Sequence, residues 1–150
     1  MKIAVGADHA GFELKEALKQ QIIDAGHDLT DLGAETYEPL DDYPDFAAKV
    51  GRAVASKEVD RAILICGSGI GASIAANKIK GVRAGIATES YAAHQGVEHD
   101  DMNVLVLASR IIGIEVAHEA VRSFLNAEFS GEERHVRRLN KVLLLEEAGE

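Results

Sequence analysis

The sequence predicts an α/β protein, a three-layer α/β/α domain with a five-stranded parallel sheet. Short runs of β-branched and apolar residues alternate with longer segments of helical periodicity, which is typical of parallel strands joined by crossover helices. Two runs, 63–65 and 104–107, are continuously apolar, as strands are when helices cover both faces of a sheet. The predicted strands are residues 3–6, 27–32, 62–66, 83–88 and 103–108.

The segments between the strands carry apolar residues at helical spacing. Leu14, Leu18 and Ile22 recur every four residues and predict a helix that ends near Gly26. The same spacing recurs later with Phe46, Val50 and Val54, with Ile70, Ile74 and Asn77, and with Val116, Ala120 and Phe124. This order is that of one continuous Rossmann-like domain over residues 1–150. A last helix, about 132–147, has more apolar surface than a lone terminal helix would expose to water. We therefore expect it to pack on a partner subunit.

Composition limits the classes of function. With 47% apolar residues, 150 residues suffice for one globular core. The 25 acidic and 16 basic residues give a net charge of −9, which opposes binding to a phosphate backbone, so we expect no nucleic-acid partner. No apolar run approaches the roughly 18 residues of a membrane span, and the N-terminus is too short for a signal-peptide core. We therefore expect a cytoplasmic protein without a membrane partner.

Reactive residues follow several predicted strands. In an open parallel sheet, ligands bind beyond the carboxyl ends of the strands. Asp8 and His9 follow the first strand, Cys66 ends the third and Arg110 follows the fifth. We expect His99, near the end of the helix before the fifth strand, to lie beside them. The sequence thus predicts a site that combines an acid, a thiol, two imidazoles and a guanidinium.

A glycine-rich segment follows the third strand and is called the glycine loop below. Its residues are Gly67, Ser68, Gly69, Ile70 and Gly71. Alternating glycines let backbone N–H groups approach a ligand at the start of a helix, which suits an anion; a tight turn without a ligand is the alternative. The loop also fits G-x-G-x-x-A through Ala72, with Glu89 about twenty residues on, so a dinucleotide site is a competing interpretation.

Cys66 and His99 are the candidate proton-transfer groups. A thiol beside a helix N-terminus and several amides should have a depressed pKa and act as a base or nucleophile; the alternative is a structural buried thiol. His99 fits a general acid influenced by Asp100 or Asp101, or a solvated residue at a helix end. Cys66 is the single cysteine and no H-E-x-x-H spacing occurs, so we predict no metal site.

Two arginines in the last helix have the spacing of a phosphate clamp. Arg134 and Arg138 are one helical turn apart and face the same way, although a solvated basic face has the same pattern. A protein of net charge −9 needs local positive charge to hold an anionic metabolite. Arg110, Arg134 and Arg138 are the candidates for that role.

These segments together resemble a known family. The matching segments are Gly6-Ala7-Asp8-His9-Ala10-Gly11, Ile65 to Gly71 running into Ala75-Ala76-Asn77-Lys78, His99 to Asn103, and Ser109-Arg110. Over its whole length the chain resembles the type B ribose-5-phosphate isomerases, a family that also includes the galactose-6-phosphate isomerase subunits.

The resemblance implies a cofactor-free aldose–ketose isomerase in pentose metabolism that interconverts ribose 5-phosphate and ribulose 5-phosphate. It implies that Cys66 moves a proton between C1 and C2 through a cis-enediolate, that His99 assists ring opening, and that Ser68 relays a proton between oxygens. The amides of the glycine loop would hold the oxyanion, an effect worth about 3 kcal/mol per good donor.

The resemblance also implies the roles of the binding residues. Asp8 would hold sugar hydroxyls, His9 would help with the phosphate, and Arg110 would join the pocket. Arg134 and Arg138 would reach the phosphate from the partner subunit of a homodimer, with further assembly into a tetramer left open.

Two segments depart from the family pattern. Asp100 stands where the family usually has asparagine, which replaces an amide donor by a carboxylate that only accepts when ionised. Glu132 and Glu133 precede the arginine clamp in place of a glycine-rich segment. A tetrose, hexose or other pentose phosphate therefore stays open as the substrate. The hypothesis from another class is a non-enzymatic nucleotide-binding module, which titration with NAD(H) or ATP would reveal.

Overall fold

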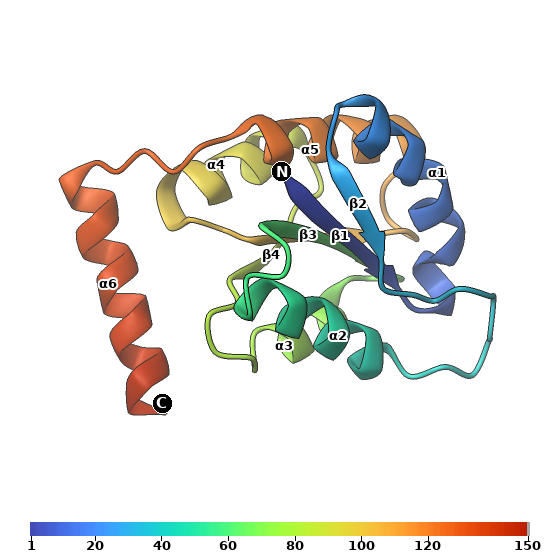
Figure 1. Ribbon diagram of the computed structural model, residues 1–150, viewed down its shortest axis with the longest axis horizontal. Helices are drawn as coiled ribbons and strands as arrows, with labels where there is room; N and C mark the ends of the chain where they lie inside the picture. The colour runs from blue at the N-terminus through green and yellow to red at the C-terminus, as the bar shows by residue number, and fades with distance from the viewer. Residues whose placement is uncertain (150) are drawn as a thin grey trace.

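Five parallel strands form one sheet between two layers of helices in the computed structural model, which describes residues 1–149 (Figure 1). The strands are β1 (Lys2–Ala7), β2 (Asp28–Asp31), β3 (Arg61–Cys66), β4 (Ala84–Ile86) and β5 (Val104–Ala108). The helices are α1 (Phe12–Asp24), α2 (Tyr43–Ala55), α3 (Ile70–Ala76), α4 (Ser90–Asp100), α5 (Ile114–Asn126) and α6 (Glu133–Ala148), and the 3-10 helix η1 (His9–Gly11) precedes α1. The predicted α/β class is confirmed, although β2 and β4 are shorter than the sequence indicated.

The order of the strands fixes where a ligand can bind. The order is β2-β1-β3-β5-β4, and every neighbouring pair is parallel. From β1 the chain moves outward to β2 and then crosses back to β3 on the other side of β1. The carboxyl ends of β1 and β3 therefore flank the point where the winding reverses, which is where open α/β sheets form their binding crevice.

The two faces of the sheet bury separate cores, as the continuous apolar runs predicted. In β3, Ile63 and Ile65 belong to the cluster that includes Phe124 of α5, while Leu64 belongs to the cluster that includes Val50 of α2. This alternation follows from the two-residue period of a strand. Figure 1 shows α1, α4 and α5 on one side of the sheet and α2 and α3 on the other.

The third helix buries a different face from the one its spacing predicted. Ile70 and Ile74 are 56% and 58% exposed, and the residues of α3 that pack on the sheet are Ala72 and Ala76. Small residues let this short helix lie close to the strands, so its larger apolar side chains point outward.

The last helix stands away from the sheet (Figure 1). Within the described part of α6, His135 is the one buried residue, and Val142, Leu144 and Leu145 are exposed. A groove of about 890 Å³ runs between α6 and the body, with Leu139 and Val142 on one wall. This exposed apolar surface on α6 agrees with the large number of apolar residues in the sequence of the last helix.

Candidate active site

Asp8 and Cys66 meet at the carboxyl end of the sheet. Asp8 follows β1 and is 4% exposed, and Cys66 is the last residue of β3. The Cys66 thiol donates a hydrogen bond to Asp8 Oδ2, with Sγ 3.1 Å from the oxygen. Asp8 Oδ1 accepts from the backbone N–H of Gly11 at 3.1 Å, which caps η1. The sequence placed both residues at this end of the sheet correctly, and the structure joins them directly.

Gly11 allows this approach because it lies against the backbone of β3. A Cβ at position 11 would lie 2.4 Å from the carbonyl oxygen of Ile65, closer than real contacts permit. The absence of a side chain lets η1 pack on the end of β3, so Asp8 reaches across to Cys66.

The predicted depression of the Cys66 pKa is wrong. Burial, together with the hydrogen bond and negative charge of Asp8, raises the pKa of the thiol to about 11. The backbone N–H groups of Gly67 and Gly69 lower the pKa, as the sequence suggested, but their effect is smaller. At neutral pH the free protein therefore holds a thiol and not a thiolate at this position.

The glycine loop begins directly after Cys66, and a side chain from another segment packs closely against each of its ends. Gly69 adopts a positive φ of 78° as the loop turns into α3, a conformation that favours glycine. A Cβ on Gly67 would lie 3.3 Å from Cδ of Arg110, and one on Gly71 would lie 2.6 Å from the ring of Tyr43. Arg110 and Tyr43 therefore flank the loop, and Ser68 and Ile70 are exposed within it.

Residues after β5 hold Arg110 against this loop. The hydroxyl of Ser109 donates to the carbonyl of Ala10 at 2.6 Å, and the N–H of Arg110 donates to the carbonyl of Gly67 at 3.0 Å. These bonds join the segments that follow β1, β3 and β5. They account for the position of the Arg110 side chain beside Gly67, the residue that follows Cys66.

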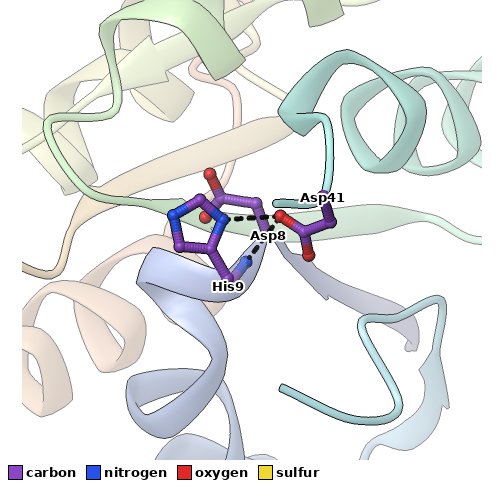
Figure 2. Close-up of side chains that lie close together, drawn as sticks. All are labelled: Asp8, His9 and Asp41. Carbon is purple, nitrogen blue, oxygen red and sulfur yellow. Dashed lines mark hydrogen bonds and ion pairs between the residues drawn. The ribbon is translucent and has the colours of Figure 1, made fainter. Parts of the chain in front are cut away.

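His9 is held by the loop that connects β2 to α2 (Figure 2). Asp41 Oδ1 accepts from the backbone N–H of His9 at 3.1 Å and lies 2.6 Å from its Nδ1. Tyr37, from the same loop, meets the His9 ring edge-on with centroids 6.3 Å apart. Sequence reasoning missed Asp41 and Tyr43, although a loop after β2 must lie at the carboxyl end of a parallel sheet.

His99 lies at the opposite end of the sheet from Cys66, so the predicted common site within one chain is wrong. α4 starts after the carboxyl end of β4 and runs back toward the start of β5, and His99 is its penultimate residue. Val104 at the start of β5 pairs with Ala62 near the start of β3, which places the end of α4 near the amino ends. The helix before a parallel strand has to end there.

The candidate residues on α6 lie on the same side of the molecule as His99, and not on the side of Cys66. The rings of His99 and His135 stack with centroids 4.1 Å apart, which joins α4 to α6. Arg134 and Arg138 are exposed on the same helix, and Arg134 Nε donates to Glu132 at 2.9 Å. Figure 1 shows β1 running away from α6 toward its carboxyl end. We call His99, His135, Arg134 and Arg138 the α6 cluster.

Asp100, which we predict to bind substrate, lies on the side of the α6 cluster. It follows His99 in α4 and lines the groove between α6 and the body, at the amino ends of the strands. Like His99, it therefore lies away from Cys66 of its own chain, and its contact with a substrate stays a prediction.

The residues considered for cofactors and metals have other partners. Glu89 accepts from the backbone N–H groups of Tyr91 and Ala92 and so caps α4, which removes the observation that favoured a dinucleotide ribose. Asp8, His9 and Asp41 bring ligand-type atoms within 4.8 Å of one another. The hydrogen bonds between His9 and Asp41, and the position of Asp8 next to His9 in the chain, account for that proximity. Among residues 1–149, no helix has the length and apolar character to cross a membrane.

Comparison with protein families and curated proteins gives full-length matches. Residues 3–142 match the family model described as Ribose/Galactose Isomerase. "Ribose-5-phosphate isomerase B" of Escherichia coli is 42% identical over 146 residues, 97% of either chain. "D-erythrulose-4-phosphate isomerase 2" of Mycolicibacterium smegmatis is 36% identical over 150 residues, 99% of either chain.

Solved structures agree with these matches. Ribose-5-phosphate isomerase B of Clostridium thermocellum has a TM-score of 0.96 at 43% identity and covers 100% of both chains. Ribose-5-phosphate isomerase B of Mycoplasma genitalium, solved with bound ribulose-5-phosphate, has a TM-score of 0.92 at 37% identity and covers 97% of this chain and 96% of that one.

Proposed function

This chain belongs to the ribose/galactose isomerase family, and we propose that it interconverts D-ribose 5-phosphate and D-ribulose 5-phosphate. Full-length relatives of that name and a close structural neighbour that holds ribulose-5-phosphate support the proposal. The observation that carries it is the Cys66 thiol, hydrogen-bonded to Asp8 and followed directly by the glycine loop. A cytoplasmic location and a place in pentose metabolism are parts of the same proposal.

Cys66 exchanges the carbon-bound proton in this scheme, and Asp8 takes part because the resting thiol is protonated. Sγ takes the proton from C2 of the open-chain aldose while its own proton passes to Asp8 Oδ2, 3.1 Å away. The carbon–hydrogen electron pair forms the double bond of a cis-enediolate. Asp8 then returns its proton to sulfur as the thiol protonates C1, which yields the ketose and restores both groups.

The glycine loop supplies the electrostatic stabilisation that this step needs. Removing a proton next to a carbonyl builds negative charge on oxygen, and amides at the start of α3 can donate to it. Ser68 is exposed in the loop and is the candidate to move a proton between the two oxygens. Arg110 and His9 lie at the same end of the sheet and are the candidates for contact with the phosphate.

A second copy of the chain would complete the site. His99, Arg134 and Arg138 lie at the amino ends of the strands, so a single chain does not bring them to its own Cys66. We propose a homodimer in which the α6 cluster of one subunit lies beside Cys66 of the other and completes its active site. The exposed apolar residues of α6 and the adjoining groove support a contact of this kind. Dimers and tetramers both satisfy this requirement.

The substitution Cys66→Ala tests the proposal directly. Isomerase activity is measured with EDTA present, following ketose formation from ribose 5-phosphate by wild type and variant. We expect a loss of at least about 1,000-fold in kcat with binding of the sugar phosphate retained, since the variant keeps the site but not the base. Near wild-type turnover by Cys66→Ala would exclude the thiol as the base.

A tetrose phosphate is the second candidate substrate. The relative named "D-erythrulose-4-phosphate isomerase 2" also covers the whole chain, and Asp100 departs from the usual pattern of the family. Comparing ribose 5-phosphate with erythrulose 4-phosphate, allose 6-phosphate and galactose 6-phosphate in one assay decides the question. A higher kcat/KM for one of the others would keep the chemistry and change the substrate.

A further inference from the structure

Asp41 makes an unusual set of contacts for a loop carboxylate. One oxygen, Oδ1, accepts from both the backbone N–H and the Nδ1 of His9, at 3.1 and 2.6 Å. The other oxygen, Oδ2, is buried and has no hydrogen-bond partner. The side chain as a whole is only 10% exposed. A carboxylate that served only to fold the loop would be expected to satisfy both oxygens within the protein.

We propose that Asp41 is a positioning residue for His9 in the isomerase site. This inference rests on the proposed function. An ionised carboxylate only accepts hydrogen bonds, so the contact at 2.6 Å requires the proton of the neutral imidazole to lie on Nδ1. Nε2 is then the ring nitrogen left to meet the substrate. Asp41 thus sets both the tautomer and the direction of the ring.

The connection between β2 and α2 is built to hold Asp41 in this place. At its start, Asp31 accepts from the N–H of Gly33 at 3.0 Å and from the buried Lys15 at 2.6 Å. Near its end, the N–H of Asp41 donates to the carbonyl of Glu38 at 3.1 Å. With the edge of Tyr37 against the same imidazole, the loop contacts His9 from two sides. The position of His9 therefore depends on a segment far from it in sequence.

The consequence for the reaction follows from the direction of the hydrogen bond at Nε2. Unprotonated Nε2 can only accept, so it binds a hydroxyl, that of the sugar or of a protonated phosphate, and loss of Asp41 frees the ring to rotate and to change tautomer, which weakens binding. The thiol and its hydrogen-bond partner Asp8 stay in place, so the chemical step continues. Asp41→Ala should therefore raise KM about tenfold and change kcat less than about twofold. Asp41→Asn keeps the volume and one acceptor, and its KM should fall between those of wild type and Asp41→Ala.

Asp42→Ala is the matched control. Asp42 is the next residue, is exposed, and its side chain makes no capping hydrogen bond to α2. This variant removes the same charge from the same loop. Its KM should stay within about twofold of wild type, because a surface charge is screened by water and salt.

A double-mutant cycle with His9→Ala separates positioning from direct contact. If Asp41 acts through His9, Asp41→Ala has no further effect on KM in the His9→Ala background. A further increase of several-fold there would mean that Asp41 touches the substrate itself, which would overturn the proposal.

Nitrogen NMR of the His9 ring gives a readout that does not depend on activity. The chain has six histidines, and comparison with His9→Ala assigns the signals of His9. The neutral ring should carry its proton on Nδ1 in wild type and in Asp42→Ala, and lose that preference in Asp41→Ala. An unchanged tautomer in Asp41→Ala would refute the positioning role. A wild-type protein without isomerase activity but with the Asp41-dependent tautomer would refute the proposed function alone.

Discussion

Opposite influences act on the thiol of Cys66, and their sum decides its protonation. Burial and the carboxylate of Asp8 favour the neutral thiol, while the N–H groups of Gly67 and Gly69 favour the thiolate. The first pair prevails, and the pKa rises to about 11. In the proposed mechanism, a bound sugar that hydrogen-bonds to Asp8 would change these influences on the pKa of Cys66, so the thiol would become reactive in the complex and not in the free protein.

The substitution Asp8→Asn tests this balance. Removal of the carboxylate charge should lower the pKa of Cys66, because Asp8 raises it in the wild type. We expect the midpoint of thiolate formation to move down by about one pH unit. Ultraviolet absorbance of the thiolate, measured as the difference from Cys66→Ala, reports this directly because the chain has one cysteine.

The control for this experiment is Asp42→Asn, which removes an exposed carboxylate and should leave the midpoint in place. A midpoint that Asp8→Asn leaves unchanged would show that burial alone sets the pKa. If Asp8 also receives the thiol proton during turnover, Asp8→Asn loses kcat even though its thiol is more acidic.

At the residue scale, the sequence revealed which groups gather but not how they influence one another. Cys66, Asp8 and Arg110 follow strands of one parallel sheet, and this rule places them together. The rise in the pKa of Cys66 depends on burial and on a contact of 3.1 Å with Asp8, which no spacing in the sequence specifies. Asp41 was missed for the same reason, since only the path of its loop brings it to His9.

Among the elements, η1 has the closest contact with the sheet. Its last residue, Gly11, leaves no room for a side chain against the backbone of Ile65, and the N-cap of η1 is the carboxylate that binds the thiol. The packing of this single turn therefore sets the distance between Asp8 and Cys66.

The substitution Gly11→Ala should push η1 away from the end of β3. The added methyl meets a backbone oxygen that cannot move away without disturbing β3. We therefore expect the free energy of unfolding to fall by about 1–3 kcal/mol. Urea unfolding of the variant measures the loss. We also expect kcat to fall, because the carboxylate is displaced from Sγ.

Gly113→Ala is the companion variant, since nothing lies within 4 Å of the added methyl and the φ there is −80°. Its free energy of unfolding should lie within about 0.5 kcal/mol of that of wild type. Equal stability of the two variants would mean that η1 can shift away from β3 at little cost.

The periodicity of the sequence predicted the order of strands and helices, because apolar spacing reflects burial directly. It was wrong about α3, where Ala72 and Ala76 make the contact that Ile70 and Ile74 were expected to make. The expected place of His99 beside Cys66 came from a different rule, that ligands bind beyond the carboxyl ends of the strands. His99 lies near the amino ends because the helix before a parallel strand ends where that strand begins.

On the scale of the whole molecule, the candidate functional groups form two sets at opposite ends of the sheet. Cys66, Asp8 and the glycine loop lie at the carboxyl ends, and the α6 cluster lies on the side of the amino ends. In the proposed homodimer with two-fold symmetry, each set would meet its counterpart on the other subunit, and this would occur twice because such an interface repeats every contact.

Mixing two inactive variants tests this arrangement. Cys66→Ala and His99→Asn are purified separately, unfolded together in equal amounts and refolded. Half of the dimers would then pair the two variants, and each of these has one site with both residues intact, so activity should return to about a quarter of wild type. Each variant refolded alone is the control. No recovery in mixed dimers confirmed by mass would contradict sharing between subunits.

The stacking of His99 on His135 has a consequence for how such proteins diversify. Because this contact keeps one set of groups on α4 and α6, away from the thiol, a substitution in one set leaves the other intact in the same polypeptide. If the proposed dimer shares its sites between subunits, then after gene duplication one copy would be free to lose its thiol and the other its arginines, and the pair would still form one working centre. An obligate partnership between two unlike chains is thus a short evolutionary step from this architecture.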